Sequence, residues 1–204
     1  MPIINPAFQT PTIGRTRPDD ASIVGSAPTT VATGLVPGLS VLEYGMEEIL
    51  RKTKFNFTNY PLAYVRTGAS NSGNSGSNEP GRIYTFPEGI IQILGSAGNL
   101  VITTPYVTTG SHLLALGSTK TSAADADLTS TEADIGQKVT ATVANNTATF
   151  AMLPLSTYVS PLNGSTTPIN LYLNFATAID TVASGNITIN GSVTVTWIAL
   201  GDNT

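Results

Sequence analysis

Few residues in this chain of 204 have the types and spacing that enzyme chemistry needs. His112 is the only histidine, and Ser111 precedes it, so a base and a nucleophile are neighbours in sequence. A Ser–His–Asp triad requires the histidine to lie beside the serine hydroxyl, whereas neighbours on a strand point to opposite faces. Alternation places His112 on one face with Leu114 and Leu116. We therefore predict a structural histidine and a protein that is not an enzyme.

Metal ligands are equally sparse. One histidine and no cysteine cannot form a zinc site of the usual kind. The only acidic cluster, Asp125, Asp127, Glu132 and Asp134, could offer oxygen ligands to calcium. Its spacing matches no EF-hand loop, and the glycine of the sharp turn is missing, so a solvated loop is the preferred interpretation. The glycine-rich residues 68–78 lack the lysine of a phosphate-binding loop, and we expect no metal and no cofactor.

Two further patterns argue against binding of sugars and nucleic acids. Trp197 shares one face of an alternating segment with Val193 and Val195, which predicts a core residue rather than a platform for sugar rings. The net charge is −4, and the nine basic residues are dense only at 51–54. Polyanion binding requires a broad basic face, so we expect no nucleic-acid partner.

The composition points instead to permanent contact with other proteins. Charged residues make up 11% of the chain, against roughly 25% in an ordinary soluble protein. Thr, Ser, Asn and Gly fill the polar positions, and desolvating them costs less than desolvating Lys or Glu. A stable extracellular β protein would share this composition and stays open as an alternative. No signal peptide or apolar run of ~18 residues is visible, so we expect no membrane partner and synthesis in a cytoplasm.

The first 40 residues differ from the rest of the chain. They contain six prolines and no sustained apolar alternation. Proline favours extended backbone, both at its own position and at the residue before it. We predict an extended N-terminal arm over residues 1–40, with a reach on the order of 100 Å at about 3.3 Å per residue. A disordered tail is the alternative, but the isolated apolar residues favour ordering on a partner.

Residues 41–204 are predicted to form an all-β body. Residues 49–58 alternate, with Phe55 and Phe57 on one face, although good helix formers at 46–52 leave a helix as an alternative there. Polar residues 117–137 are expected to form a long insertion at one end of the body, and residues 68–78 a flexible loop. Short segments separated by turn signals indicate a β-sandwich or barrel. The further predicted strands cover residues 62–66, 82–86, 90–94, 100–104, 112–116, 138–143, 147–150, 169–176 and 187–200.

Several short motifs follow one another along the body. Leu-Glu-Tyr-Gly at 42–45 leads into a strand that ends with Phe-Thr-Asn at 57–59. Ile-Tyr-Thr-Phe-Pro-Glu-Gly at 83–89 precedes an apolar strand, and a Thr-, Ala- and Asp-rich middle follows. The body closes with Ile-Thr-Ile-Asn-Gly-Ser-Val-Thr-Val-Thr-Trp at 187–197. This order, over roughly residues 41–200, resembles that of capsid decoration (cement) proteins of tailed bacteriophages.

The resemblance implies a β-sandwich or jelly-roll-like body on the outside of an icosahedral head. Such proteins are often homotrimers that contact several copies of the major capsid protein, and the family has no catalytic residues to carry over. We therefore expect a structural virion protein of the capsid exterior that stabilises the shell. The residues expected to contact the shell or a neighbouring subunit are Ile3, Ile4, Phe8, Ile13, Arg15, Arg17, Ile23 and Val24.

Other roles stay open beside this one. A phage tail-fibre or adhesin-type receptor-binding β module would share the composition, although its loops should carry aromatic or charged residues. A minor capsid protein or coat jelly roll is a further possibility. A hydrolase is disfavoured because no group of residues meets the geometric requirements of an active site.

Overall fold

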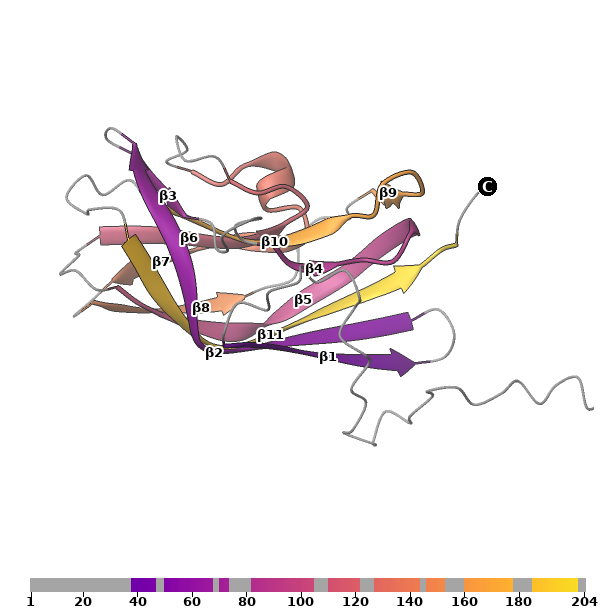
Figure 1. The fold of residues 1–204 in the computed structure, drawn as a ribbon, viewed down its shortest axis with the longest axis horizontal. Coiled ribbons are helices and arrows are strands. Elements are labelled where there is room, and N and C mark those ends of the chain that lie inside the picture. Colours follow the sequence, from indigo (N-terminus) through magenta and orange to yellow (C-terminus); the bar gives the residue numbers. More distant parts are fainter. Residues whose placement is uncertain are drawn as a thin grey trace, which may run out of the picture.

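The described residues of the computed structural model are mostly β-strand, which confirms the predicted all-β class (Figure 1). The model describes residues 38–46, 50–67, 70–73, 82–104, 110–121, 127–143, 146–152, 160–177 and 185–201. A short 3₁₀ helix, η2 (Ser130–Glu132), lies between β6 and β7. The strands are β1 (Leu39–Met46), β2 (Leu50–Thr67), β3 (Ser70–Gly73), β4 (Arg82–Thr85), β5 (Gly89–Thr103), β6 (Gly110–Gly117), β7 (Gly136–Val143), β8 (Thr147–Met152), β9 (Leu162–Gly164), β10 (Asn170–Thr177) and β11 (Gly185–Ala199).

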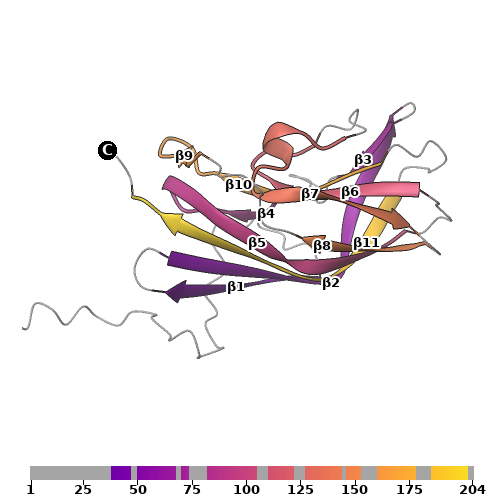
Figure 2. The same cartoon turned by 180° about the vertical axis from the view of Figure 1, so that it is seen from behind.

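The strands pair antiparallel in one continuous sheet with the order β7-β6-β10-β3-β2-β11-β5-β8. Strand β1 adds to β2, β4 to β10 and β9 to β5. The sheet curls into two layers, as Figures 1 and 2 show from opposite sides. We call β1, β2, β11, β5 and β8 the lower layer and β4, β10, β6 and β7 the upper layer, as they lie in Figure 1. Strands β7 and β8, at the two ends of the order, lie side by side.

The inner faces of the two layers form one hydrophobic core. Phe55 of β2 and Leu100 of β5 cluster with Leu173 of β10, and all three are fully buried. Trp197 is buried as well, and its ring centroid lies 5.3 Å from that of Phe86. The predicted core position of Trp197 is confirmed.

Two hydrogen bonds satisfy polar groups inside this core. The indole Nε1 of Trp197 donates to Oγ1 of Thr53 at 2.9 Å. The Tyr84 hydroxyl on β4 donates to Oε1 of Glu43 on β1 at 2.8 Å, which ties the upper layer to the lower one. Burial, and then the charge of Glu43, raise the pKa of the Tyr84 hydroxyl far above its usual range, so it remains a donor.

Two pairs of predicted strands are each one long strand. The predicted segments 49–58, from Leu50 onward, and 62–66 both belong to β2, which has 18 residues. The predicted segments 90–94 and 100–104, as far as Thr103, both belong to β5, which has 15 residues. Both strands continue because β11 pairs along almost their whole length and supplies the backbone partners. The intervening polar and glycine residues therefore mark irregularities within strands, not turns between them.

The irregularity in β2 is a bulge at Asn59, whose φ is 51°. Two residues of β2 there oppose only Asn190 on β11. The Oδ1 atom of Asn190 accepts a hydrogen bond from the Asn59 backbone N–H at 2.8 Å. Phe57 before the bulge and Tyr60 after it both point into the core, although strict alternation would put them on opposite faces.

Strands β5 and β11 approach closely at two glycines. A Cβ atom on Gly191 would lie 2.2 Å from the carbonyl oxygen of Asn99, and φ of Gly191 is 117°. A Cβ atom on Gly98 would lie 2.2 Å from the carbonyl oxygen of Ser192. Only glycine fits such an approach, so these residues permit the close pairing of the two strands at this point.

The segment predicted as a flexible glycine-rich loop contains a strand. Ser70–Gly73 forms β3, which pairs with β2 on one side and with β10 on the other. Pairing on both sides satisfies its backbone, so the weak strand propensity of Ser, Asn and Gly does not decide the outcome. This short strand connects the two layers in the order of the sheet.

The alternative of a helix at 46–52 is wrong where the chain is described. Met46 is the last residue of β1, and Leu50 is the first of β2. Strand β2 pairs with both β1 and β11 in this region, and that pairing overrides local helix propensity. Within the described ranges, no helix has the length and apolar character needed to cross a membrane.

Candidate functional site

The predicted arm falls almost entirely outside the described residues. All eight predicted contact residues, from Ile3 to Val24, lie there, and their role stays a prediction. The described chain begins at Gly38, whose carbonyl oxygen accepts a hydrogen bond from the Thr58 N–H at 2.7 Å. The predicted arm included Leu39 and Ser40, but both residues belong to β1.

The polar insertion was predicted to lie at one end of the body. Its described residues lie instead over one face of the upper layer (Figure 1). We call residues 118–121 and 127–135 the cover. Leu128 of the cover is buried against Ala115 of β6 and Ala176 of β10, on their outer sides. The apolar anchor inside a polar segment explains why the insertion packs on the sheet instead of extending into solvent.

A single buried amide holds the cover to β10. Asn174 is fully buried, and its Oδ1 accepts a hydrogen bond from the Thr121 N–H at 3.0 Å. Its Nδ2 donates to the carbonyl oxygens of Thr119 and Glu132, both at 2.8 Å. An amide carries both a donor and an acceptor, so one side chain satisfies three backbone groups of the cover.

Within the cover, a carboxylate fixes the start of the segment. Both the backbone N–H and the hydroxyl of Ser118 donate to Asp134, to Oδ1 and Oδ2 respectively, at 2.7 Å. Burial raises the pKa of the Asp134 carboxyl, and the hydrogen bonds from Ser118 oppose that rise. The Thr119 N–H donates to the carbonyl oxygen of Thr131 at 3.1 Å.

The described acids of the predicted cluster act separately. Oε2 of Glu132 accepts a hydrogen bond from the Thr129 N–H at 3.0 Å. Asp127 forms an ion pair with Lys138 of β7 at 2.6 Å, and this hydrogen bond lowers the pKa of the Asp127 carboxyl. Asp125 lies outside the described residues. Among the residues described, no three His, Cys, Asp or Glu side chains are grouped as metal ligands.

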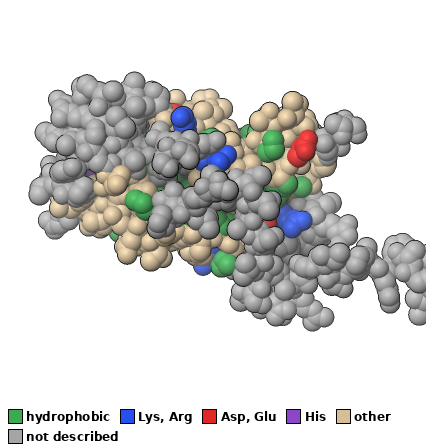
Figure 3. All heavy atoms as spheres, in the orientation of Figure 1, with side chains coloured by type: hydrophobic (Ala, Val, Ile, Leu, Met, Phe, Trp, Pro, Cys, Tyr) green, Lys and Arg blue, Asp and Glu red, His purple; other side chains and the backbone are tan. Residues whose placement is uncertain are grey.

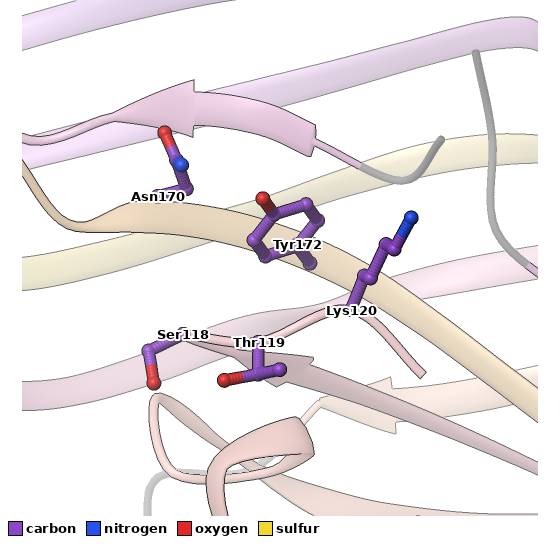
Figure 4. Close-up of a pocket in the computed structure, with 5 residues that line it drawn as sticks. All are labelled: Ser118, Thr119, Lys120, Asn170 and Tyr172. Atoms are coloured by element: carbon purple, nitrogen blue, oxygen red, sulfur yellow. The ribbon is translucent and has the colours of Figure 1, made fainter. Parts of the chain in front are cut away.

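A pocket of about 360 Å³ opens where the cover meets the start of β10 (Figure 4). Ser118, Thr119 and Lys120 line it from the cover, and Asn170 and Tyr172 line it from the outer side of β10. Figure 4 shows Lys120 and Tyr172 as neighbours, with the Lys120 ammonium group and the Tyr172 hydroxyl pointing away from each other. The Thr85 hydroxyl donates to Oδ1 of Asn170 at 2.8 Å and so orients that amide.

His112 and Ser111 do not form a catalytic pair. His112 is buried on the inner side of β6 with Leu114, whereas Ser111 is exposed, as alternation predicted. The imidazole lies beside the ring of Phe175, with centroids 5.4 Å apart. Burial lowers the pKa of His112 to about 4, because the charged form is poorly solvated there.

The outer side of the lower layer, which we call the open face, is built from uncharged polar residues. Strand register places them in rows across β1, β2, β11, β5 and β8. Lys52 and Lys54 carry the only charges on the described part of this face. Figure 3, viewed from the same side as Figure 1, shows few charged side chains among the coloured residues. The polar residues of the open face are Ser40, Asn56, Thr58, Asn99, Thr103, Thr147, Thr149, Thr188, Asn190, Ser192, Thr194 and Thr196.

At one end of the open face, register brings Leu50 and Ile198 together, and Leu94 and Leu200 belong to the neighbouring parts of β5 and of the chain after β11; we call these four residues the apolar patch. Leu50 pairs with Ile198 across β2 and β11. Leu94 falls at a register shift where it has no partner residue on β11, and 51% of it is exposed. Leu200 is 55% exposed, so the patch presents two large apolar side chains to solvent. Apolar groups that cluster at the surface are typical of contact sites, whereas scattered ones are not.

Comparisons with known proteins found no relative of this chain: no family model, no curated protein and no solved structure matches it. The site residues must therefore be argued from the geometry. Sequence reasoning did not single out Asn174, Tyr172 or Lys120. A signal for Asn174 was present, because it is an amide inside the apolar run of β10, and a polar residue there needs buried partners.

Proposed function

We propose that the chain is a structural virion protein that decorates the exterior of a bacteriophage capsid and stabilises the shell. The open face is the surface proposed to meet the major capsid protein. The observation that carries this proposal is the composition of that face: neutral polar rows with an apolar patch at one end. The order of motifs that resembles decoration proteins supports it independently.

The physical argument rests on desolvation. Contact with another protein removes water from the whole buried area, and Thr, Ser and Asn lose less than charged groups do. The apolar patch adds favourable burial, at about 25 cal/mol per Å² of apolar surface. Modest contacts repeated by the symmetry of a trimer and a shell combine into tight attachment. Lys52 and Lys54 would meet acidic groups of the capsid protein.

The arm is proposed as the second attachment point. Gly38, where the described chain begins, is hydrogen-bonded to Thr58 in the lower layer. The arm therefore starts from the layer that carries the open face. Its apolar residues would fill grooves of the shell or of a neighbouring copy, or would extend a neighbour's sheet.

The test uses expanded heads of the phage that encodes the chain, purified without this protein. The heads are incubated with the full chain and imaged by cryo-electron microscopy. We expect density at symmetric sites on the shell exterior, and light scattering should give a trimer for the free protein. Bare shells beside a folded protein would overturn the proposal.

Two variants locate the attachment. Leu94→Glu combined with Leu200→Glu places charge in the exposed patch and should abolish decoration. Thr140→Glu combined with Thr142→Glu, at exposed positions of β7 in the upper layer, is the matched control and should decorate normally. Deleting residues 2–30 should leave a folded body that fails to stay on the shell. If the deletion variant decorates as well as the full chain, the role of the arm is wrong.

A further inference from the structure

We propose that the pocket between the cover and β10 binds an acidic carbohydrate, with Lys120 contacting the sugar carboxylate and Tyr172 contacting the sugar ring. The pocket volume of about 360 Å³ lies at the small end of the range for ligand sites, which suits one or two sugar units. Its walls come from elements far apart in sequence, residues 118–120 and the first residues of β10.

The wall formed by the cover is fixed before any ligand arrives. Ser118 is held by Asp134, and the Thr119 carbonyl and the Thr121 N–H are held by Asn174. Lys120 lies between these anchored residues, so its backbone has little freedom. A preformed wall loses less conformational entropy on binding, which leaves more of the contact energy for affinity.

The opposite wall is equally well defined. Asn170 and Tyr172 alternate with the buried Leu171 and therefore both face outward from β10. The hydrogen bond from Thr85 orients the Asn170 amide at one end of the pocket. Farther along β10 the cover lies over Asn174, so the pocket is the uncovered start of the same strand face.

The chemistry of the lining selects the ligand class. Among the five described residues that line the pocket, Lys120 alone is charged, and it is exposed. An exposed ammonium group is the kind of donor that binds the carboxylate of a uronic or sialic acid. The Tyr172 ring offers an apolar surface for the C–H face of a sugar, and the Asn170 amide and Thr119 hydroxyl match sugar hydroxyls.

The pocket and the open face lie on opposite sides of the body. The cover lies above the upper layer, and the open face is the underside of the lower layer (Figures 1 and 2). A copy attached through its open face would hold the pocket away from the shell. Carbohydrate binding does not rest on that attachment, since it is measured on the isolated chain.

The test measures binding of two matched pairs of probes to the full chain by isothermal titration calorimetry and ligand-observed NMR. Tri-galacturonic acid is compared with its methyl ester, and 3′-sialyllactose is compared with lactose. We expect at least one of the acids to bind, and its neutral partner to bind about tenfold more weakly, as the loss of a charge-assisted hydrogen bond predicts.

Variants place the binding in this pocket. Lys120→Gln should weaken binding of the acid about tenfold and leave the neutral probe unchanged. Tyr172→Ala should abolish binding, whereas Tyr172→Phe should retain most of it because the ring stays; circular dichroism confirms that each variant is folded. Lys52→Gln, an exposed lysine of the open face, is the control with the same charge change and should bind normally.

Three outcomes would overturn the proposal. These are no binding of either acid, equal binding of an acid and its neutral partner, and binding that survives both Lys120→Gln and Tyr172→Ala. None of them bears on shell attachment, which the cryo-electron microscopy experiment decides separately.

Discussion

The open face and the face beneath the cover each carry an asparagine within a strand, but the two asparagines lie in opposite environments. Asn56 on the open face is half-buried, and its Nδ2 reaches the Ser40 hydroxyl only at 3.4 Å. Asn174 on the covered face is fully buried and makes three hydrogen bonds of 2.8 to 3.0 Å. The same amide is therefore an optional surface group in one layer and a structural anchor in the other.

The size of the side chains on the two faces explains why the cover packs on one of them. Small side chains on β6 and β10, such as Ala115 and Ala176, leave room for Leu128 of the cover. The open face carries branched Thr side chains at neighbouring positions of paired strands, and none of the strands or helices drawn in colour lies over it in Figure 1.

Of the substitutions that compare the two faces, replacing Asn174 should lower the free energy of unfolding most. Asn174→Ala leaves the buried Thr121 N–H and two part-buried carbonyl oxygens without the amide that they bond, so the free energy of unfolding should fall by about 3 kcal/mol. Asn56→Ala on the open face should lower it by less than about 0.5 kcal/mol. Urea unfolding measures both, and similar losses for the two variants would contradict the anchoring role of Asn174.

The apolar anchor of the cover gives the next largest effect. Leu128→Ala creates a cavity over Ala115 and Ala176 and should lower the free energy of unfolding by up to about 3 kcal/mol. Leu94→Ala removes the same atoms from an exposed position and should change it by less than about 0.5 kcal/mol. Hydrogen exchange of residues 127–135 should rise in Leu128→Ala alone; unchanged protection there would show that the cover is held by other contacts.

Lowering the pH should reduce the free energy of unfolding through the buried His112 of the upper layer. In the folded chain the pKa of His112 is lowered to about 4, against 6.5 in the unfolded chain. The unfolded state therefore binds the proton first, and the stabilisation by neutral His112 is complete above pH 6.5 and lost as the pH falls toward 4.

The expected loss is about 1.4 kcal/mol per pH unit within that window. Urea unfolding between pH 7 and pH 4 should show this slope in the natural chain and a flatter curve in His112→Gln. The raised pKa of Asp134 acts in both proteins and does not affect the difference. Parallel curves would mean that His112 is not kept neutral by burial.

The ion pair between the cover and β7 should matter least. Lys138 and Asp127 are 36% and 55% exposed, so water and salt screen their attraction. Asp127→Asn should lower the free energy of unfolding by less than about 0.5 kcal/mol, and the change should vanish in 1 M NaCl. Denaturant unfolding at two salt concentrations measures this, and a large salt-independent loss would assign Asp127 a structural role beyond the pair.

The amino-acid sequence by itself determined the all-β class, the core position of Trp197 and the burial of His112 beside Leu114. These follow from alternation, because a period of two residues assigns side chains to faces without knowledge of the partner strands.

Only the tertiary structure decided where strands continue, what the insertion covers and where a pocket forms. The bulge at Asn59 depends on pairing with β11, and the strand at Ser70–Gly73 depends on pairing with β10 as well as with the adjacent β2. Strands β11 and β10 are distant in sequence from the residues that they fix. Lys120 and Tyr172 become neighbours because Asn174 fixes the cover on β10. Local propensity cannot encode such contacts, since hydrogen-bond partners separated by more than 50 residues are chosen only when the layers assemble.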